Sequence, residues 1–287
     1  MSALPRPRLH LGDGAPAPRW RSRATLALAS LHVSVTRGNL RMPVLKALDV
    51  LLPARSLPAV TAELAPGVAI ELDPGGAMAR ASLIAAGYEH REVEVLARAT
   101  GPGGVFLDVG ANIGWFTLML AVHRPRAQVW AFEPLPGTAD RLADNVRRAR
   151  CANVRVIRAA AGRATGSARF VLTGDDAFAH RLHGPESAPG RAPVHTCEVT
   201  TVDEQWHRAG APRVDAMKVD VEGAETDVLA GAEEVLRRDR PLLMVETPTA
   251  ESAAAVREAV APHGYRGLAV PGVLPYNTFF AAAGGAA

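Results

Sequence analysis

The chain has 287 residues, of which 48% are hydrophobic and 21% are charged, and its formal net charge is +3. This composition is enough to bury a proper core, as one large α/β domain or two small ones. The weak net charge gives no basis for a nucleic-acid-binding protein. No apolar run reaches the roughly 18 residues that a membrane helix needs.

Cysteine usage and the N-terminus bear on where the protein works. Cys151 and Cys197 stand far apart and form no metal-ligand spacing, which favours a reduced, cytoplasmic protein. The N-terminus is rich in arginine but has no apolar stretch behind it, so we expect no signal peptide. We therefore expect a cytoplasmic protein with neither a membrane nor a nucleic-acid partner.

Residues 1–65 differ in composition and pattern from the remainder of the chain. Residues 1–22 are rich in Pro, Gly and Arg and are expected to form a disordered tail. Residues 24–64 hold helix-like apolar stretches broken by prolines. We interpret residues 1–65 as a tail with a helical N-terminal extension, for which a homodimer contact is an alternative use. Residues 66–287 then form the main domain.

The main domain shows apolar strands alternating with amphipathic helices. Strands are expected at 67–73, 105–110, 128–134, 154–162, 215–223, 241–247, 265–270 and 277–282, and helices at 91–99, 113–123, 137–150, 224–238 and 250–264. The alternation predicts a mainly parallel sheet with helices on both faces. The polar stretch 162–200 interrupts it and is expected to form a hairpin and a loop.

A glycine-rich turn, "FLDVGANIG", follows the strand at 105–110. In open α/β sheets the ligand lies beyond the carboxyl ends of the strands. Gly110 and Gly114 allow a sharp turn and the approach of a ligand to the backbone. Glu133 ends the next strand, and an acid there suits the two hydroxyls of a ribose. These features predict a nucleotide-cofactor site.

The departures of this turn from the dinucleotide fingerprint indicate which cofactor it holds. Asn112 stands in place of the second glycine, which hinders the approach of a pyrophosphate. Asp108 would repel a diphosphate but suits a cationic amino group. The pattern favours S-adenosylmethionine (SAM) over NAD, with NAD binding and a purely structural turn as alternatives.

A group of acids at 220–225 is the candidate catalytic site. Asp220 and Glu222 alternate with Lys218, so the three side chains share one face of a strand. Either acid could orient or deprotonate an acceptor hydroxyl, and an ion-pair cluster is the alternative. A divalent metal on both acids, with Glu246 as third ligand, is possible in chemical terms but is not expected.

Two further residues are weaker candidates. His183 lies in the polar insertion and could act as the base if that loop covers the acceptor pocket, whereas a solvated loop is the alternative. Glu89, with Tyr88, could face the methyl end of the cofactor, whereas a helix cap is the alternative.

Several of these segments together resemble the FkbM-type SAM-dependent methyltransferases. They are "FLDVGANIGWFT", "FEP" at 132–134 and above all "KVDVEGAE", and the resemblance covers about residues 66–281. It implies a class I methyltransferase fold, a Rossmann-like doubly wound sheet of seven strands with the last one antiparallel. It also implies O-methylation of a small natural product, sugar or carboxylate as the activity.

The resemblance also carries over residue positions. The cofactor turn corresponds to Asp108, Gly110, Asn112 and Gly114, the ribose acid to Glu133, and the residue near adenine to Ala160. Asp220 and Glu222 lie at the mouth where the methyl group must point. Methylation of nitrogen, or of a protein or glycan, an NAD(P)-dependent oxidoreductase and a non-catalytic scaffold remain alternatives.

Overall fold

The computed structural model describes residues 4, 8–11, 60–72, 89–173, 178–181 and 194–283. The chain divides into two compact units. The first comprises Met1–His90 with Gly174–Ala177, and the second comprises Arg91–Thr173 with Phe178–Ala287.

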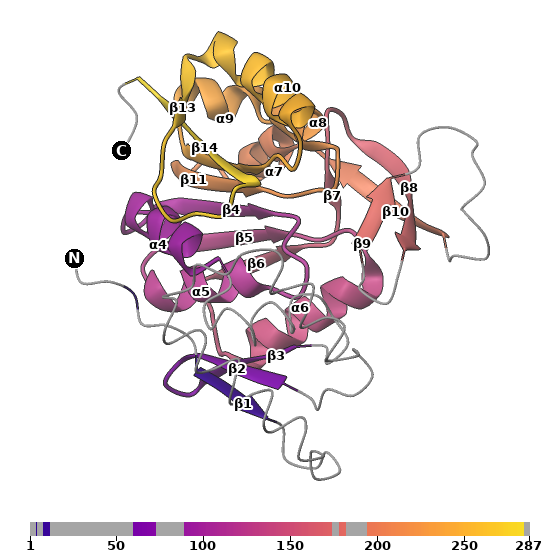
Figure 1. Cartoon of the computed structure of the whole chain (residues 1–287). Helices are drawn as coiled ribbons and strands as arrows, with labels where there is room; N and C mark the ends of the chain where they lie inside the picture. The colour runs from indigo at the N-terminus through magenta and orange to yellow at the C-terminus, as the bar shows by residue number, and fades with distance from the viewer. Residues whose placement is uncertain are drawn as a thin grey trace, which may run out of the picture. The chain divides into compact units, whose positions relative to one another are not determined.

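The described part of the first unit contains a three-stranded antiparallel sheet in the order β1-β2-β3, formed by Arg8–Leu11, Val60–Ala65 and Val68–Leu72 (Figure 1). Gly67, at φ 76°, makes the turn between β2 and β3. Strand β1 falls where a disordered tail was expected, and that expectation is wrong for these four residues. Most of the predicted helical extension lies outside the described residues. Its end is described and forms strand β2, not a helix.

The second unit is built on a seven-stranded sheet in the order β13-β14-β12-β11-β4-β5-β6. In chain order the strands are β4 (Val105–Val109), β5 (Gln128–Phe132), β6 (Val154–Ile157), β11 (Val214–Val219), β12 (Leu242–Glu246), β13 (Tyr265–Leu268) and β14 (Asn277–Ala282). Strand β14 runs antiparallel to both of its neighbours, and the other pairs are parallel. The predicted seven-stranded fold with an antiparallel last strand is confirmed.

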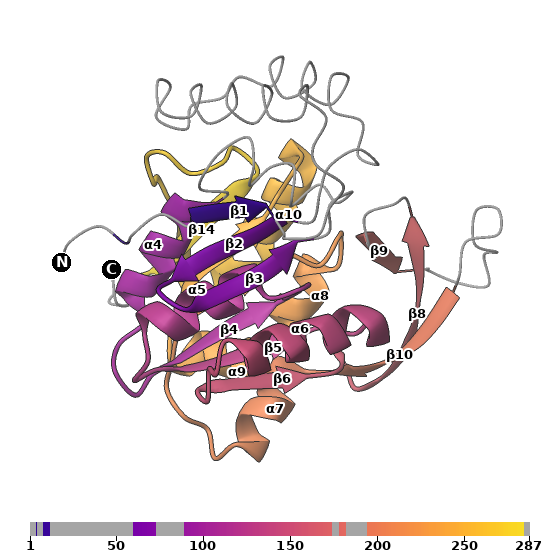
Figure 2. The same ribbon diagram turned by 90° about the horizontal axis from the view of Figure 1, so that it is seen from below.

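Helices cover both faces of this sheet. They are α4 (His90–Ala99), α5 (Trp115–His123), α6 (Pro136–Arg148), α7 (Val202–Arg208), α8 (Glu225–Ala230), α9 (Glu233–Arg238), α10 (Ala250–Val260) and the 3-10 turn η2 (Ala261–His263). Figures 1 and 2 show α4, α5 and α6 on one face and α7–α10 on the other. None of the described helices has the length and apolar character needed to cross a membrane.

The central strands β4 and β11 are buried along their whole length, and alternate side chains point to opposite faces of the sheet. Val105, Leu107 and Val109 belong to the apolar core on the α7–α10 face. Asp108 therefore points to the α5 face, where its register partner on β11 is Lys218. Alternation along two buried strands thus brings an acid and a base together inside the protein.

The single helix expected at 224–238 is two helices in the structure, α8 and α9, which are separated at Gly231. A Cβ at this position would lie 2.0 Å from the Gly162 carbonyl oxygen, so the backbones of the two residues touch. Helix α7 was not predicted. Its signal is present in the sequence, since Thr201 caps the helix by accepting from the Glu204 amide, as the Thr-x-x-Glu pattern allows.

The polar insertion forms a second sheet in the order β7-β10-β8-β9. Its strands are β7 (Ala160–Ala161), β8 (Gly166–Thr173), β9 (Phe178–Arg181) and β10 (Val194–Thr200). The consecutive antiparallel strands β8 and β9 confirm the predicted hairpin, and β10 pairs with the other edge of β8. Figure 2 shows these strands beyond the end of β6. The strand expected at 154–162 is interrupted after Ile157, and β7 leaves the main sheet to pair with β10.

Candidate active site

The turn after β4 is tied to the end of β5 by backbone hydrogen bonds. The amides of Gly110 and Ala111 both donate to the Phe132 carbonyl, at 3.1 and 2.9 Å. Gly110, Asn112 and Gly114 have φ values of 83°, 50° and 99°. Asparagine is one of the few side chains that adopt this left-handed conformation readily. The residue that departs from the dinucleotide pattern therefore fits the backbone of this turn.

Close packing explains why the turn has glycine, and no larger residue, at Gly110 and Gly114. A Cβ on Gly110 would lie 1.8 Å from the backbone oxygen of Asp220, and one on Gly114 would lie 2.6 Å from Cδ1 of Leu142. The sharp turn was predicted, whereas these neighbours come from distant parts of the chain and were not. Gly110 brings the cofactor turn into backbone contact with the acidic end of β11.

We expect Gly110→Ala to lower the free energy of unfolding by at least about 2 kcal/mol, because the new methyl group meets backbone and the positive φ is strained. Gly137→Ala is the matched control, since a Cβ there has no neighbour within 4 Å. Urea denaturation of the two variants measures the difference. Equal stabilities would contradict the packing described for Gly110.

Asp108 lies fully inside the protein, with none of its surface exposed. The Thr117 hydroxyl donates to its Oδ2 at 2.6 Å, and the Lys218 ammonium lies 3.5 Å from its Oδ1. Sequence reasoning missed Thr117, although it is the polar residue in the otherwise apolar start of α5, "WFTLMLA". In this structure the Asp108 carboxylate is held by protein groups, and direct contact with a cofactor amine stays a prediction.

Glu133 follows β5 and joins two neighbouring segments. Its Oε2 accepts from the Asn112 amide and its Oε1 from the Leu135 amide, both at 3.0 Å. Burial raises the pKa of Glu133 to about 7, and the two amide hydrogen bonds oppose that rise. The carboxylate thus stands at the tip of the second strand, as expected, and is poised to titrate near neutral pH.

Three carboxylates meet beyond the ends of β11 and β12. Oxygen atoms of Asp220, Glu222 and Glu246 all lie within 4.8 Å of one another. Burial, followed by the charge of Asp220 and a hydrogen bond to it, raises the pKa of Glu246 to about 8. Protonation of Glu246 therefore relieves the repulsion within this group at neutral pH. Such a group can orient an acceptor hydroxyl or take up its proton.

The other candidates are placed as follows. Ala160 packs against an apolar cluster that includes Leu135 and Cys197. Burial, and then the charge of Glu133, raises the pKa of Cys197, so this cluster lies close to Glu133. Glu89 precedes α4 with φ 48° and belongs to the first unit. His183 lies outside the described residues, and the roles of all these residues stay predictions.

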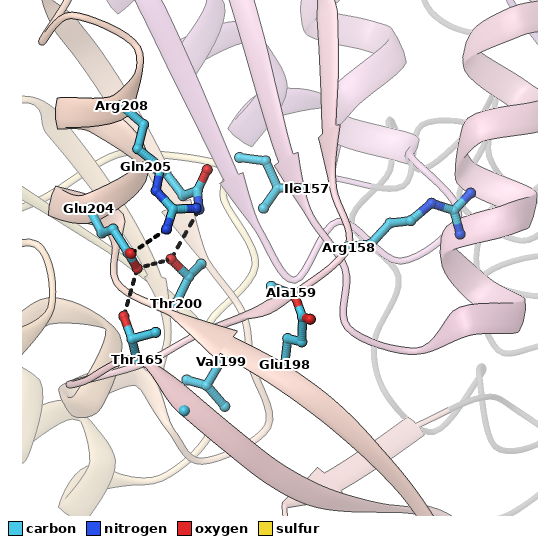
Figure 3. A pocket seen from close by; sticks show the side chains of 11 residues that line it. Ile157, Arg158, Ala159, Thr165, Glu198, Val199, Thr200, Glu204, Gln205 and Arg208 are labelled. Atoms are coloured by element: carbon cyan, nitrogen blue, oxygen red, sulfur yellow. Dashed lines mark hydrogen bonds and ion pairs between the residues drawn. The ribbon is translucent and has the colours of Figure 1, made fainter.

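A cavity of about 400 Å³ lies between the end of β6, the hairpin sheet and α7 (Figure 3). The Glu204 carboxylate inside it accepts from Thr165 and Thr200 and pairs with Arg208. Its lining residues include none of the predicted site residues. We therefore place the candidate active site at the turn and the acidic group, not in this cavity.

The family model of the methyltransferase FkbM domain matches residues 108–266, more than half of the chain. The chain belongs to the FkbM methyltransferase family. The match begins at Asp108 and includes the turn, Glu133 and the three clustered carboxylates. It confirms the predicted family and, with it, a SAM-dependent methyltransferase domain.

The curated relatives that match this FkbM-family chain are 28–32% identical to it over the aligned residues. AMB antimetabolite synthetase AmbE of Pseudomonas aeruginosa is 28% identical over 68% of this chain and 11% of its own length. The 2-O-methyltransferase NoeI of Sinorhizobium fredii is 29% identical over 53% and 65%, and the 31-O-demethyl-FK506 methyltransferase FkbM of Streptomyces tacrolimicus is 29% identical over 46% and 61%. The chain thus spans less than two thirds of each of these relatives.

Among solved structures, a methyltransferase FkbM of Methylobacillus flagellatus KT matches 70% of this chain and 54% of its own, with a TM-score of 0.45 and 17% identity.

Proposed function

We propose that this protein transfers a methyl group from SAM to an oxygen atom, a hydroxyl or a carboxylate, of a small metabolite such as a natural product or a sugar. The observation that carries the proposal is the family match that starts at Asp108 and covers both the turn and the acidic group. One relative is named a 2-O-methyltransferase and another a 31-O-demethyl-FK506 methyltransferase, which supports oxygen as the acceptor atom.

The chemistry of the turn fits SAM better than a dinucleotide. The residues there supply carboxylates, Asp108 and Glu133, which accept hydrogen bonds from an amine or from hydroxyls. Lys218, the cation that lies beside Asp108, is buried and already pairs with acids. Glu133 would hold the ribose hydroxyls, and the apolar cluster around Ala160 would lie against the adenine.

When bound, SAM supplies an electrophilic methyl group on its sulfonium. The protein's part is to bring an acceptor oxygen about 3 Å from that carbon, in line with the bond that breaks. An alcohol acceptor also has to lose a proton, for which Asp220 and Glu246 form a nearby pair. A carboxylate acceptor needs no base, but its charge would meet the three acids of this group.

Binding and turnover of the full chain test the proposal. Calorimetry should show binding of S-adenosylhomocysteine and none of NADH. Transfer from methyl-tritiated SAM should then appear with at least one member of a panel of hexoses, hexuronates and hydroxylated macrocycles. Binding of NADH alone would favour the oxidoreductase alternative. Label transferred only to amines would favour N-methylation.

A further inference from the structure

Lys218 is a buried lysine in the middle of the site, and its side chain is 4% exposed. It is the fifth of the six residues of β11. Its neighbours Met217 and Val219 belong to the core on the α7–α10 face. The lysine therefore points to the α5 face, where its Nζ lies 5.2 Å from the centre of the Phe116 ring.

The Lys218 ammonium faces oxygens from three separate parts of the site. Nζ donates to the Gly110 carbonyl at 2.9 Å, lies 3.1 Å from Oδ2 of Asp220 and 3.5 Å from Oδ1 of Asp108. These oxygens belong to the cofactor turn, to the end of β11 and to β4. Lys218 thus hydrogen-bonds the Gly110 carbonyl and forms ion pairs with the two acids, whereas Oδ1 of Asp108 is buried without a hydrogen-bond partner.

This arrangement couples two halves of the site that have different tasks. Gly110 and Asp108 belong to the turn that would hold the cofactor, whereas Asp220 belongs to the group that would meet the acceptor. Asp220 is itself partly exposed, and besides its hydrogen bond with Glu246 the Lys218 ammonium is the charged group that restricts its rotamers. Its amide donates to the Val109 carbonyl at 3.0 Å, which fixes the backbone there but not the side chain.

We propose that Lys218 is a positioning residue for methyl transfer, which holds the Asp220 carboxylate in a fixed place relative to the cofactor turn. The inference rests on the proposed function. Lys218 acts through Asp220 and the Gly110 carbonyl and does not touch the acceptor. The competing explanation is that Lys218 only neutralises the buried charge of Asp108, in which case its loss would destabilise the fold without any specific effect on Asp220.

A double-mutant cycle on turnover separates the two explanations, using the acceptor that is active with the wild-type protein. Lys218→Met keeps a similar length and volume without the charge. We expect Lys218→Met and Asp220→Asn each to lower kcat about tenfold or more, with a smaller change in KM for SAM. The double variant should be no slower than the slower single variant, because both changes remove the same function.

Arg238→Met is the matched control. It removes another ion pair to a buried acid, Asp239, on the α7–α10 side of the sheet. It should alter stability while leaving kcat and KM unchanged. If Lys218→Met does not fold, Lys218→Gln takes its place in the cycle under the same criterion.

The outcomes distinguish the two proposals. Independent losses that multiply in the double variant would overturn the role of Lys218 while leaving methyl transfer intact. A kcat unchanged in the single lysine variant would do the same. Absence of methyl transfer by the wild-type protein across the whole acceptor panel would overturn the proposed function, and the role of Lys218 with it.

Discussion

Replacing Asp108 with alanine should lower the free energy of unfolding by about 3 kcal/mol or more. The side chain is fully buried, and its loss removes the acceptor of the Thr117 hydroxyl and one of the two acids that face the Lys218 ammonium. A buried charge that loses a partner costs far more than an exposed one. Urea denaturation monitored by circular dichroism measures the loss.

Asp140→Ala is the control for Asp108→Ala. Asp140 pairs with Arg158 at 2.8 Å on the surface, where both side chains are more than half exposed. Exposed pairs of this kind contribute about 0–1 kcal/mol. Similar stabilities of the two variants would show that Asp108 is not held as the structure describes. Calorimetry on the folded fraction should also show S-adenosylhomocysteine binding weakened tenfold or more, equal to about 1.4 kcal/mol.

Affinity for S-adenosylhomocysteine should fall as the pH drops below about 7, by up to about tenfold per pH unit. In the proposed site the ionised carboxylate of Glu133 would accept hydrogen bonds from both ribose hydroxyls, whereas the protonated form loses part of that capacity. Because burial raises the pKa of Glu133 to about 7, the weak-binding form predominates below that pH. Titration calorimetry from pH 5.5 to 8.5 measures the profile.

Glu133→Gln should bind about tenfold more weakly at pH 8 and lose this pH dependence, because it has no proton to release. Glu258→Gln, at an exposed position on α10, should keep the wild-type profile. A wild-type affinity that stays constant between pH 6 and pH 8 would contradict the role of Glu133. The raised pKa of Glu133 also makes the stability of the free protein depend on pH.

Between pH 4.5 and 7 the folded state of the free protein holds a proton on Glu133 that the unfolded state has already lost. This group's contribution to stability is therefore largest at low pH and declines as the pH rises through that window. Cofactor binding to the ionised form offsets part of the decline. The unfolding midpoint with and without S-adenosylhomocysteine should thus separate most clearly above pH 7.

Much of the sheet could be predicted because its strands are short apolar runs between amphipathic helices. The turn at Gly110, the acid at Glu133 and the "KVDVEG" segment all mark strand ends, so their meeting at one edge follows from parallel topology alone. The burial of Asp108 also has a local cause, since it occupies an inward position of a central strand.

Contacts between distant segments could not be predicted in the same way. Nothing in the sequence near Gly231 shows that its backbone touches Gly162, and this contact divides one expected helix into two. The strand at Val60–Ala65 pairs with β3 on one edge and, on the other, with β1, about fifty residues earlier in the chain. The fixed position of Lys218 among three oxygens likewise depends on the register between β11 and β4.

The two amides bonded to Glu133 give the site built-in spectroscopic reporters. The Asn112 and Leu135 N–H groups donate to different oxygens of the carboxylate, one from the turn before α5 and one from the turn before α6. A ligand that engages both oxygens, as a pair of ribose hydroxyls would, alters both hydrogen bonds. Their nuclear magnetic resonance frequencies and hydrogen-exchange rates should therefore change together on cofactor binding, which would locate the ribose without a crystal.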